Sequence, residues 1–164
     1  MFDGRGRLSI FRIAIIGAVI GIVLIIGGVF ALNADQNSRR GPLIIDPYPG
    51  AVIWGDPHDE SDSSVSYYMR VPDAPPETVA QYYQQRLADF SSGERCVRTP
   101  GQGDMPVDPS QPNSIPYRYD CLFDRSSRNA TQYTRISIFP EMPDMDPYTN
   151  FTGTIIYYIQ VWQP

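Results

Sequence analysis

An uninterrupted apolar run is the first pattern along the chain. Residues 13–32 contain no charged side chain and no side-chain hydrogen-bonding group. Because a helix rises about 1.5 Å per residue, this run reaches roughly the 30 Å of a bilayer's hydrocarbon core. It predicts one transmembrane helix over 13–32, preceded by a cytoplasmic N-terminus over 1–12. The alternative is a cleaved signal peptide, since arginines precede the run, but a signal-peptide core spans only about 7 to 15 residues.

Small residues recur on one side of this predicted helix. At about 100° per residue, one stripe holds Ala14, Gly17, Ala18, Gly21 and Gly28. Small residues in register let a second helix backbone approach closely, which favours association in lipid. The stripe predicts packing against an integral membrane protein or against a second copy of the helix. The alternative explanation is that glycine is common in membrane helices.

The pattern changes after the apolar run. Residues 33–49 are polar at first and then rich in proline, which predicts a short tether. Over residues 50–164, the pattern of apolar and polar residues predicts a small extracytoplasmic α+β domain. We expect a mainly antiparallel sheet packed by one helix. The helix is expected over 73–90, with Asp73 as a candidate N-cap. The expected strands are rich in β-branched and aromatic residues and cover 51–55, 64–71, 95–99, 117–123, 131–139 and 152–162.

The final strand is apolar on both faces. Alternation places Ile155, Tyr157, Ile159 and Val161 on one face, and Ile156, Tyr158 and Trp162 on the other. A single helix covers only one side of a sheet. Either long loops roof the second face, or that face contacts another protein, where aromatic residues are favoured. The candidate contact residues are those on the face that the helix leaves free, taken from Tyr157, Tyr158 and Trp162.

The two cysteines, Cys96 and Cys121, fall in successive predicted strands. Both lie in the segment expected to be exported, where disulfides form readily. They predict a disulfide that closes a loop of roughly 25 residues. A redox pair would require a CxxC motif and a metal site would require nearby histidines, and the sequence has neither.

Charge indicates orientation and excludes one class of partner. Three arginines precede the apolar run and two follow it, which favours a cytoplasmic N-terminus. From Gly41 onward eight arginines face sixteen acidic residues, a net charge of −8, so no attraction to nucleic acid is expected. We expect a single-pass protein of the bacterial inner membrane, in contact with the lipid bilayer, with its C-terminal domain in the periplasm or outside the cell.

Few residues in the sequence suit catalysis. His58 is the single histidine and lies in an acidic stretch expected to be a loop. The acids of that stretch lack the spacing of an EF-hand, so solvated side chains are favoured over a calcium site; they are Asp56, Asp59, Glu60 and Asp62. Met142 and Met145 lack the paired histidine or cysteine of a copper site. We expect neither an enzyme nor a bound metal or cofactor.

Two short motifs carry a resemblance. A Tyr-Pro-Gly-Ala turn spans 48–51, and a helix motif follows with Val79, Tyr82, Tyr83 and Leu87. Residues 48–90 thereby resemble small extracytoplasmic domains of bacterial single-span proteins. Anchored subunits of this kind are similar to accessory chains of energy-transducing complexes in filamentous anoxygenic phototrophs, such as alternative complex III. The resemblance implies a stabilising subunit related to electron transport, with integral membrane proteins as partners and no catalytic residue. The alternatives are a free anchored module that binds a ligand or soluble partner, and an anchored enzyme.

Overall fold

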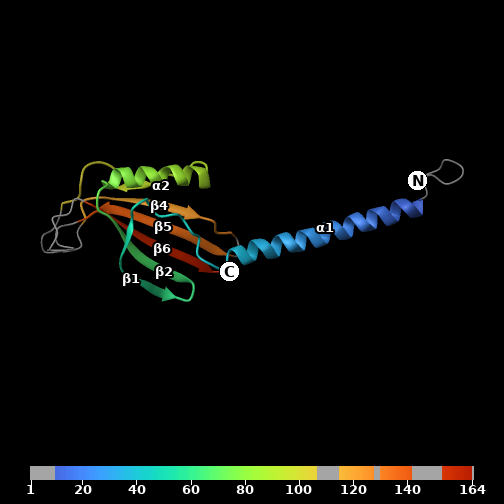
Figure 1. Ribbon diagram of the computed structural model, residues 1–164. Coiled ribbons are helices and arrows are strands. Elements are labelled where there is room, and N and C mark those ends of the chain that lie inside the picture. Colours follow the sequence, from blue (N-terminus) through green and yellow to red (C-terminus); the bar gives the residue numbers. More distant parts are fainter. Residues whose placement is uncertain (1–9, 107–114, 128–129, 142–152, 164) are drawn as a thin grey trace. The chain divides into compact units, whose positions relative to one another are not determined.

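The structure is a computed structural model that describes residues 10–106, 115–127, 130–141 and 153–163. It divides into two compact units, Met1–Ser38 and Arg39–Pro164. In the first unit the described residues form the helix α1 (Ile10–Ser38). The second unit, called the outer domain below, contains β1 (Val52–Ser61), β2 (Ser64–Val71), α2 (Pro76–Phe90), β3 (Val97–Thr99), β4 (Arg118–Asp124), β5 (Thr131–Pro140) and β6 (Thr154–Gln163), as Figure 1 shows.

The predicted membrane span lies within α1. Its apolar part, Ala14–Asp35, is 22 residues long, and none of it is buried within the chain. Such a segment extends about 33 Å as a helix, enough to cross the hydrocarbon core. The helix starts before and ends after the predicted boundaries of 13 and 32. A single candidate span and a disulfide in the outer domain are compatible with a membrane protein.

The outer domain is built on one antiparallel sheet, which confirms the predicted α+β class. Its strand order is β1-β2-β6-β5-β4-β3, so the C-terminal strand β6 lies in the interior of the sheet. On one side, β6 pairs with β2 from Thr154 to Val161. On the other side, it pairs with β5 from Thr154 to Gln163. The side chains of β6 up to Val161 therefore have neighbours on two flanking strands.

The helix α2 covers one face of this sheet (Figure 1). Val79, Tyr83 and Leu87 recur at four-residue spacing and are fully buried. The helix begins at Pro76 after the extended residue Pro75, and no side chain caps its N-terminus. The predicted cap at Asp73 is therefore wrong. Proline suits the first helical turn, because its missing N–H is not needed there and its fixed φ is already helical.

Two tyrosine hydroxyls meet at the centre of the core. Tyr83 of α2 and Tyr158 of β6 are fully buried, and their hydroxyl oxygens lie 2.6 Å apart. The backbone N–H of Tyr48 donates to the Tyr83 hydroxyl at 2.8 Å. Burial raises the pKa of Tyr83 to about 12 and also raises the pKa of Tyr158. Both side chains are thus neutral and hydrogen-bonded over the physiological pH range.

The segment that follows α1 packs against the outer domain. Gln132 Nε2 donates to the carbonyl of Gly41 at 2.9 Å, and Gln160 Nε2 donates to the carbonyl of Leu43 at 3.0 Å. The predicted tether over 33–49 is therefore divided: residues 33–38 continue α1, and residues from 41 onward contact β5 and β6. This segment shares the α2 face of the sheet and completes the layer over the core.

The edge strand β1 is longer than predicted. Expected over 51–55, it continues to Ser61 across register shifts between Trp54 and His58 and between Asp59 and Ser61. The acidic stretch around His58 is thus strand and not the expected loop. Bulges, a proline and charged residues on an edge strand hinder pairing with another chain, and Pro57 lies within this stretch.

Candidate functional site

One row of side chains crosses the face of the sheet opposite α2. The register places Trp54 of β1 beside Tyr68 of β2, and Tyr68 beside Tyr157 of β6. The row continues through Ser137 of β5 to Asp120 of β4. Because cross-strand partners share a face, these five residues lie together. We call this side of the sheet the helix-free face.

The β1, β2 and β6 half of the row is aromatic. The rings of Tyr68 and Tyr157 stack with centroids 4.4 Å apart and planes 17° apart. Trp54 meets Tyr68 edge to face, at 6.3 Å and 80°. Tyr68 keeps 39% of its surface exposed, which is unusual for a large ring in the interior of a sheet. Burial, followed by the nearby Tyr157, raises the pKa of Tyr68, so its hydroxyl remains protonated at neutral pH.

The β5 and β4 half of the row is polar. Arg118 Nε lies 2.9 Å from Asp120 Oδ2, and Ser137 Oγ donates to Asp120 Oδ1 at 2.6 Å. Both carboxylate oxygens of Asp120 therefore have partners. Arg135 lies two residues before Ser137 on β5, on the same face of the sheet, and is exposed. Among the residues that the structure describes, none forms an ion pair or hydrogen bond with Arg135.

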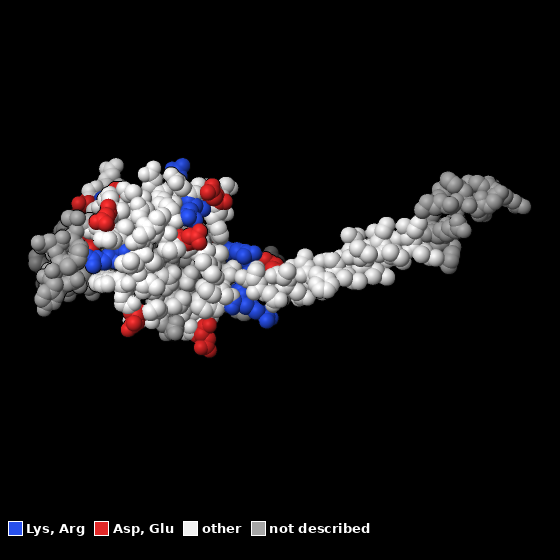
Figure 2. Space-filling model, in the orientation of Figure 1, with Lys and Arg blue, Asp and Glu red and all other residues white. Residues whose placement is uncertain are grey.

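Together these residues line a hollow of about 600 Å³ on the helix-free face. Ile159 and Phe139 contribute apolar surface beside the aromatic row. Two arginines and one aspartate line the hollow, so its charge is positive although the whole chain carries −5. Elsewhere, acidic and basic side chains are interspersed over the visible surface of the outer domain in Figure 2. Aromatic rings beside arginine are the composition typical of a contact surface.

The predicted contact residues fall on different faces. Tyr157 lies on the helix-free face and remains a predicted contact residue. Tyr158 faces α2 and is fully buried, so it is wrong as a contact residue. Trp162 alternates with Tyr157 along β6 and lies, half-buried, on the α2 side at the end of the strand. Its backbone N–H donates to the carbonyl of Ser63 at 2.9 Å.

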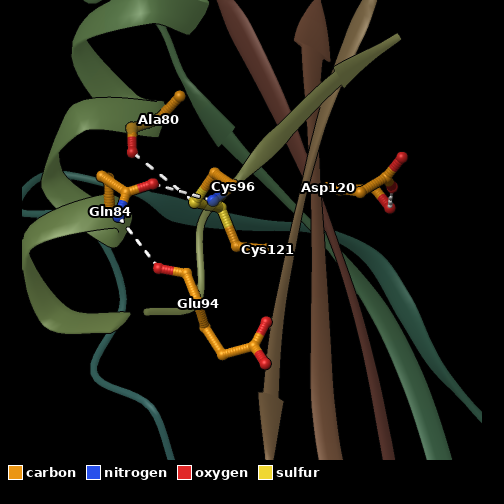
Figure 3. Close-up of a disulfide and its surroundings, with 7 residues drawn as sticks. Ala80, Gln84, Glu94, Cys96, Asp120 and Cys121 are labelled. Atoms are coloured by element: carbon orange, nitrogen blue, oxygen red, sulfur yellow. Dashed lines mark hydrogen bonds between the residues drawn. A yellow bond between two sulfur atoms is a disulfide. The ribbon is translucent and has the colours of Figure 1, made fainter. Parts of the chain in front are cut away.

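The predicted disulfide between Cys96 and Cys121 is confirmed, with an S–S distance of 2.01 Å. Gln84 of α2 accepts a hydrogen bond from the Cys96 backbone N–H at 2.8 Å. In Figure 3, Cys121 points toward α2 while its neighbour Asp120 points away, from the other side of β4. The bond thus fastens the chain that follows α2 to the inner side of β4. It leaves the helix-free face to Asp120 and its neighbours.

The small residues of α1 have no partner within the described chain. A Cβ built on Gly17, Gly21 or Gly28 meets no atom within 4 Å. At about 100° per residue, Ile25 falls within the same stripe between Gly21 and Gly28, which shortens the uninterrupted small surface to 14–21. The stripe remains free to meet another helix.

Metal-binding arrangements are not found in the described part of the chain. No group of three or more His, Cys, Asp or Glu side chains gathers there. His58 is exposed on β1. Met142 and Met145 lie outside the described residues. No family model, curated protein or solved structure matches this chain.

Proposed function

We propose that the chain is a membrane-anchored accessory subunit of a larger bacterial membrane complex and carries out no chemistry of its own. The observation that carries this proposal is the helix-free face, where Trp54, Tyr68 and Tyr157 form an aromatic row beside arginines. Three adjacent aromatic rings are not expected on a sheet face that is always exposed to water. Tyr, Trp and Arg are the residues that contribute most to protein contacts.

The helix α1 supports the same proposal from the membrane side. Its span is apolar all round, and none of it is buried by the part of the chain that the structure describes. The surface at 14–21 is small enough for a neighbouring helix to approach closely. A subunit held both by a helix and by an outer face would be fixed in orientation over its complex.

The proposed orientation places the N-terminus in the cytoplasm and the outer domain outside the inner membrane. The disulfide supports this orientation, since disulfides persist in oxidising compartments. Protease added to intact spheroplasts should remove the outer domain. Full protection of the domain would reverse the orientation.

A narrower proposal concerns the kind of complex. The resemblance over 48–90 favours an energy-transducing complex related to electron transport, of the type found in filamentous anoxygenic phototrophs. The test is purification in mild detergent from the native membrane, followed by native electrophoresis and mass spectrometry. The chain should co-migrate with integral membrane proteins of such a complex at a defined ratio.

A pair of helix variants tests how the subunit is held. Gly21→Ile adds a side chain on the small stripe and should push a neighbouring backbone away, so the subunit should be lost from the purified complex. Ile22→Leu changes the shape of an exposed side chain outside the stripe and should be retained. Equal retention of the two variants would mean that the stripe is not an interface.

The hollow itself favours a second candidate, a free anchored module that binds a small ligand. Its volume of about 600 Å³ is in the range of ligand sites, and Arg135 offers a positive charge that no described residue pairs with. This candidate predicts that the chain migrates alone in mild detergent. Co-migration with membrane proteins at a fixed ratio would decide for the accessory subunit.

A further inference from the structure

Arg135 occupies an unusual position on the helix-free face. In the register its cross-strand neighbours on that face are Ile159 of β6 and Leu122 of β4, both apolar. The aromatic row runs along the next position of the sheet, through Tyr157. The nearest cross-strand neighbours of this guanidinium are thus apolar, while Arg118, Asp120 and Glu94 line the same part of the face.

The nearby carboxylate is already engaged. Asp120 pairs with Arg118 through one oxygen and accepts the Ser137 hydroxyl through the other. Both of its oxygens therefore have a partner other than Arg135. While the face meets water, the guanidinium is solvated and this arrangement costs nothing.

The situation changes once another molecule covers the face. Removing a charged group from water without a hydrogen-bonding partner is strongly unfavourable. A molecule that packs on the aromatic row must therefore supply an acceptor to Arg135. A carboxylate is the best match, because its two oxygens fit the planar fork of the guanidinium.

We infer that the protein seated on the helix-free face is a neighbouring membrane protein whose contact surface presents an Asp or Glu side chain to Arg135. This carboxylate is set in an apolar patch that covers Trp54, Tyr68 and Tyr157. The inference rests on the proposed accessory function and names the chemistry of its partner. A second copy of this chain fits less well, since two such faces would bring their positive charges together.

The absence of lysine from the chain gives a direct test. A single Arg135→Lys substitution introduces the only side-chain amine, and a carbodiimide joins an amine to a carboxylate only when the two are in contact. The variant is expressed in place of the native chain, membranes are treated, and the complex is purified and mapped by mass spectrometry. We expect an amide between the introduced lysine and an Asp or Glu of a neighbouring membrane protein.

Arg86→Lys is the matched control on the other side of the sheet. Arg86 belongs to α2, and its Nη1 lies 3.1 Å from Asp46 Oδ2 of the same chain. The control should give an amide within the chain, to Asp46, and none to the partner. It confirms that the coupling works on this protein and that a partner amide is specific to the helix-free face.

Charge reversal gives a second measurement. Arg135→Glu should place two carboxylates together and lower retention of the chain in the purified complex at least tenfold. Arg86→Glu on α2 should change retention less than twofold. Equal retention of the two variants would contradict the inference.

The coupling results separate failure of the inference from failure of the proposed function. A chain that co-migrates with the complex but forms only amides within itself, to Asp120 or Asp124, would overturn the acidic contact and leave the accessory role standing. An amide to a second copy of the chain would replace the partner by a self-contact and overturn the inference. A chain that co-migrates with no membrane protein would remove the accessory role and the inference with it.

Discussion

Removing either hydroxyl of the buried Tyr83–Tyr158 pair should destabilise the fold, but by different amounts. Tyr83→Phe removes the group that bonds both the Tyr158 hydroxyl, at 2.6 Å, and the Tyr48 backbone N–H, at 2.8 Å. The buried Tyr158 hydroxyl and the part-buried Tyr48 N–H then lose their partner. Tyr158→Phe removes one hydroxyl, and the Tyr83 hydroxyl keeps its bond from Tyr48. The two substitutions delete the same atom type and should still differ in cost.

The expected magnitudes follow from these contacts. A buried polar group left without a partner costs about 1–3 kcal/mol, and loss of one neutral hydrogen bond costs about 1 kcal/mol. Tyr83→Phe should therefore lower the free energy of unfolding by about 2–4 kcal/mol, and Tyr158→Phe by about 1 kcal/mol. The double variant should cost less than the sum by about 1 kcal/mol, because the Tyr158 hydroxyl can no longer be left unsatisfied.

Urea unfolding of the full chain in a mild non-ionic detergent measures these differences, with the disulfide kept oxidised. Both tryptophans, Trp54 and Trp162, belong to the outer domain, so their fluorescence reports its unfolding. The slope of the free energy of unfolding against urea concentration should be the same for all variants, so that their unfolding midpoints can be compared directly. Equal costs for the two single variants, combined with strict additivity, would refute the buried hydroxyl pair.

The same pair also predicts a dependence on alkaline pH. Burial raises the pKa of Tyr83 from 10.0 to about 12 in the folded chain, and the pKa of Tyr158 is raised as well. A group whose folded pKa is raised stabilises fully below its unfolded pKa, and this contribution is lost as the pH rises toward the folded pKa. Stability should thus be level below about pH 10 and fall between pH 10 and 12. The double phenylalanine variant should show a shallower fall in the same urea assay.

Two further stability predictions can be tested by the same urea unfolding experiment. Replacing both Cys96 and Cys121 by alanine removes a cross-link between residues 25 apart and should lower the free energy of unfolding by about 3.5 kcal/mol; a loss below about 1 kcal/mol would contradict this estimate. Gly153→Ala would place its Cβ 2.7 Å from the backbone carbonyl oxygen of Val71 and 2.8 Å from Glu141 Oε2. The backbone and the carboxylate that pairs with Arg70 would both have to shift, at a cost of about 2–3 kcal/mol. Gly101→Ala, with nothing within 4 Å, should stay within about 0.5 kcal/mol.

Local patterns predicted several elements well. The strand β2 occupies 64–71 as expected, because its alternating β-branched and aromatic residues are bounded by turn residues at both ends. The α2 face was equally clear, since Val79, Tyr83 and Leu87 recur with helical spacing and are all buried. The start of α2 was misplaced, because two successive prolines define it without any side-chain cap.

Non-local pairing was beyond the reach of the sequence. Each strand shows which residues alternate, but not which strand lies beside it or in which register. The row through Trp54, Tyr68 and Tyr157 depends on the order β1-β2-β6, which joins the start of the domain to its end. The packing of residue 41 and its neighbours was also hidden. It depends on amides of Gln132 and Gln160 that donate to backbone carbonyls far away in the sequence.

The two faces of β6 differ in a way that the strand alone does not reveal. On the α2 side, the cross-strand neighbours of Ile156 and Tyr158 on β2 and β5 are uncharged: Met69, Tyr67, Ile138 and Ile136. On the helix-free side, Tyr157 and Ile159 lie beside an exposed arginine that has no partner in the described chain. A fully buried face would exclude that charge. A face that is always exposed to water would not be expected to carry three adjacent aromatic rings. The combination fits the proposed role: a surface that is solvated in the isolated chain and is covered in an assembly whose partner would supply the acceptor.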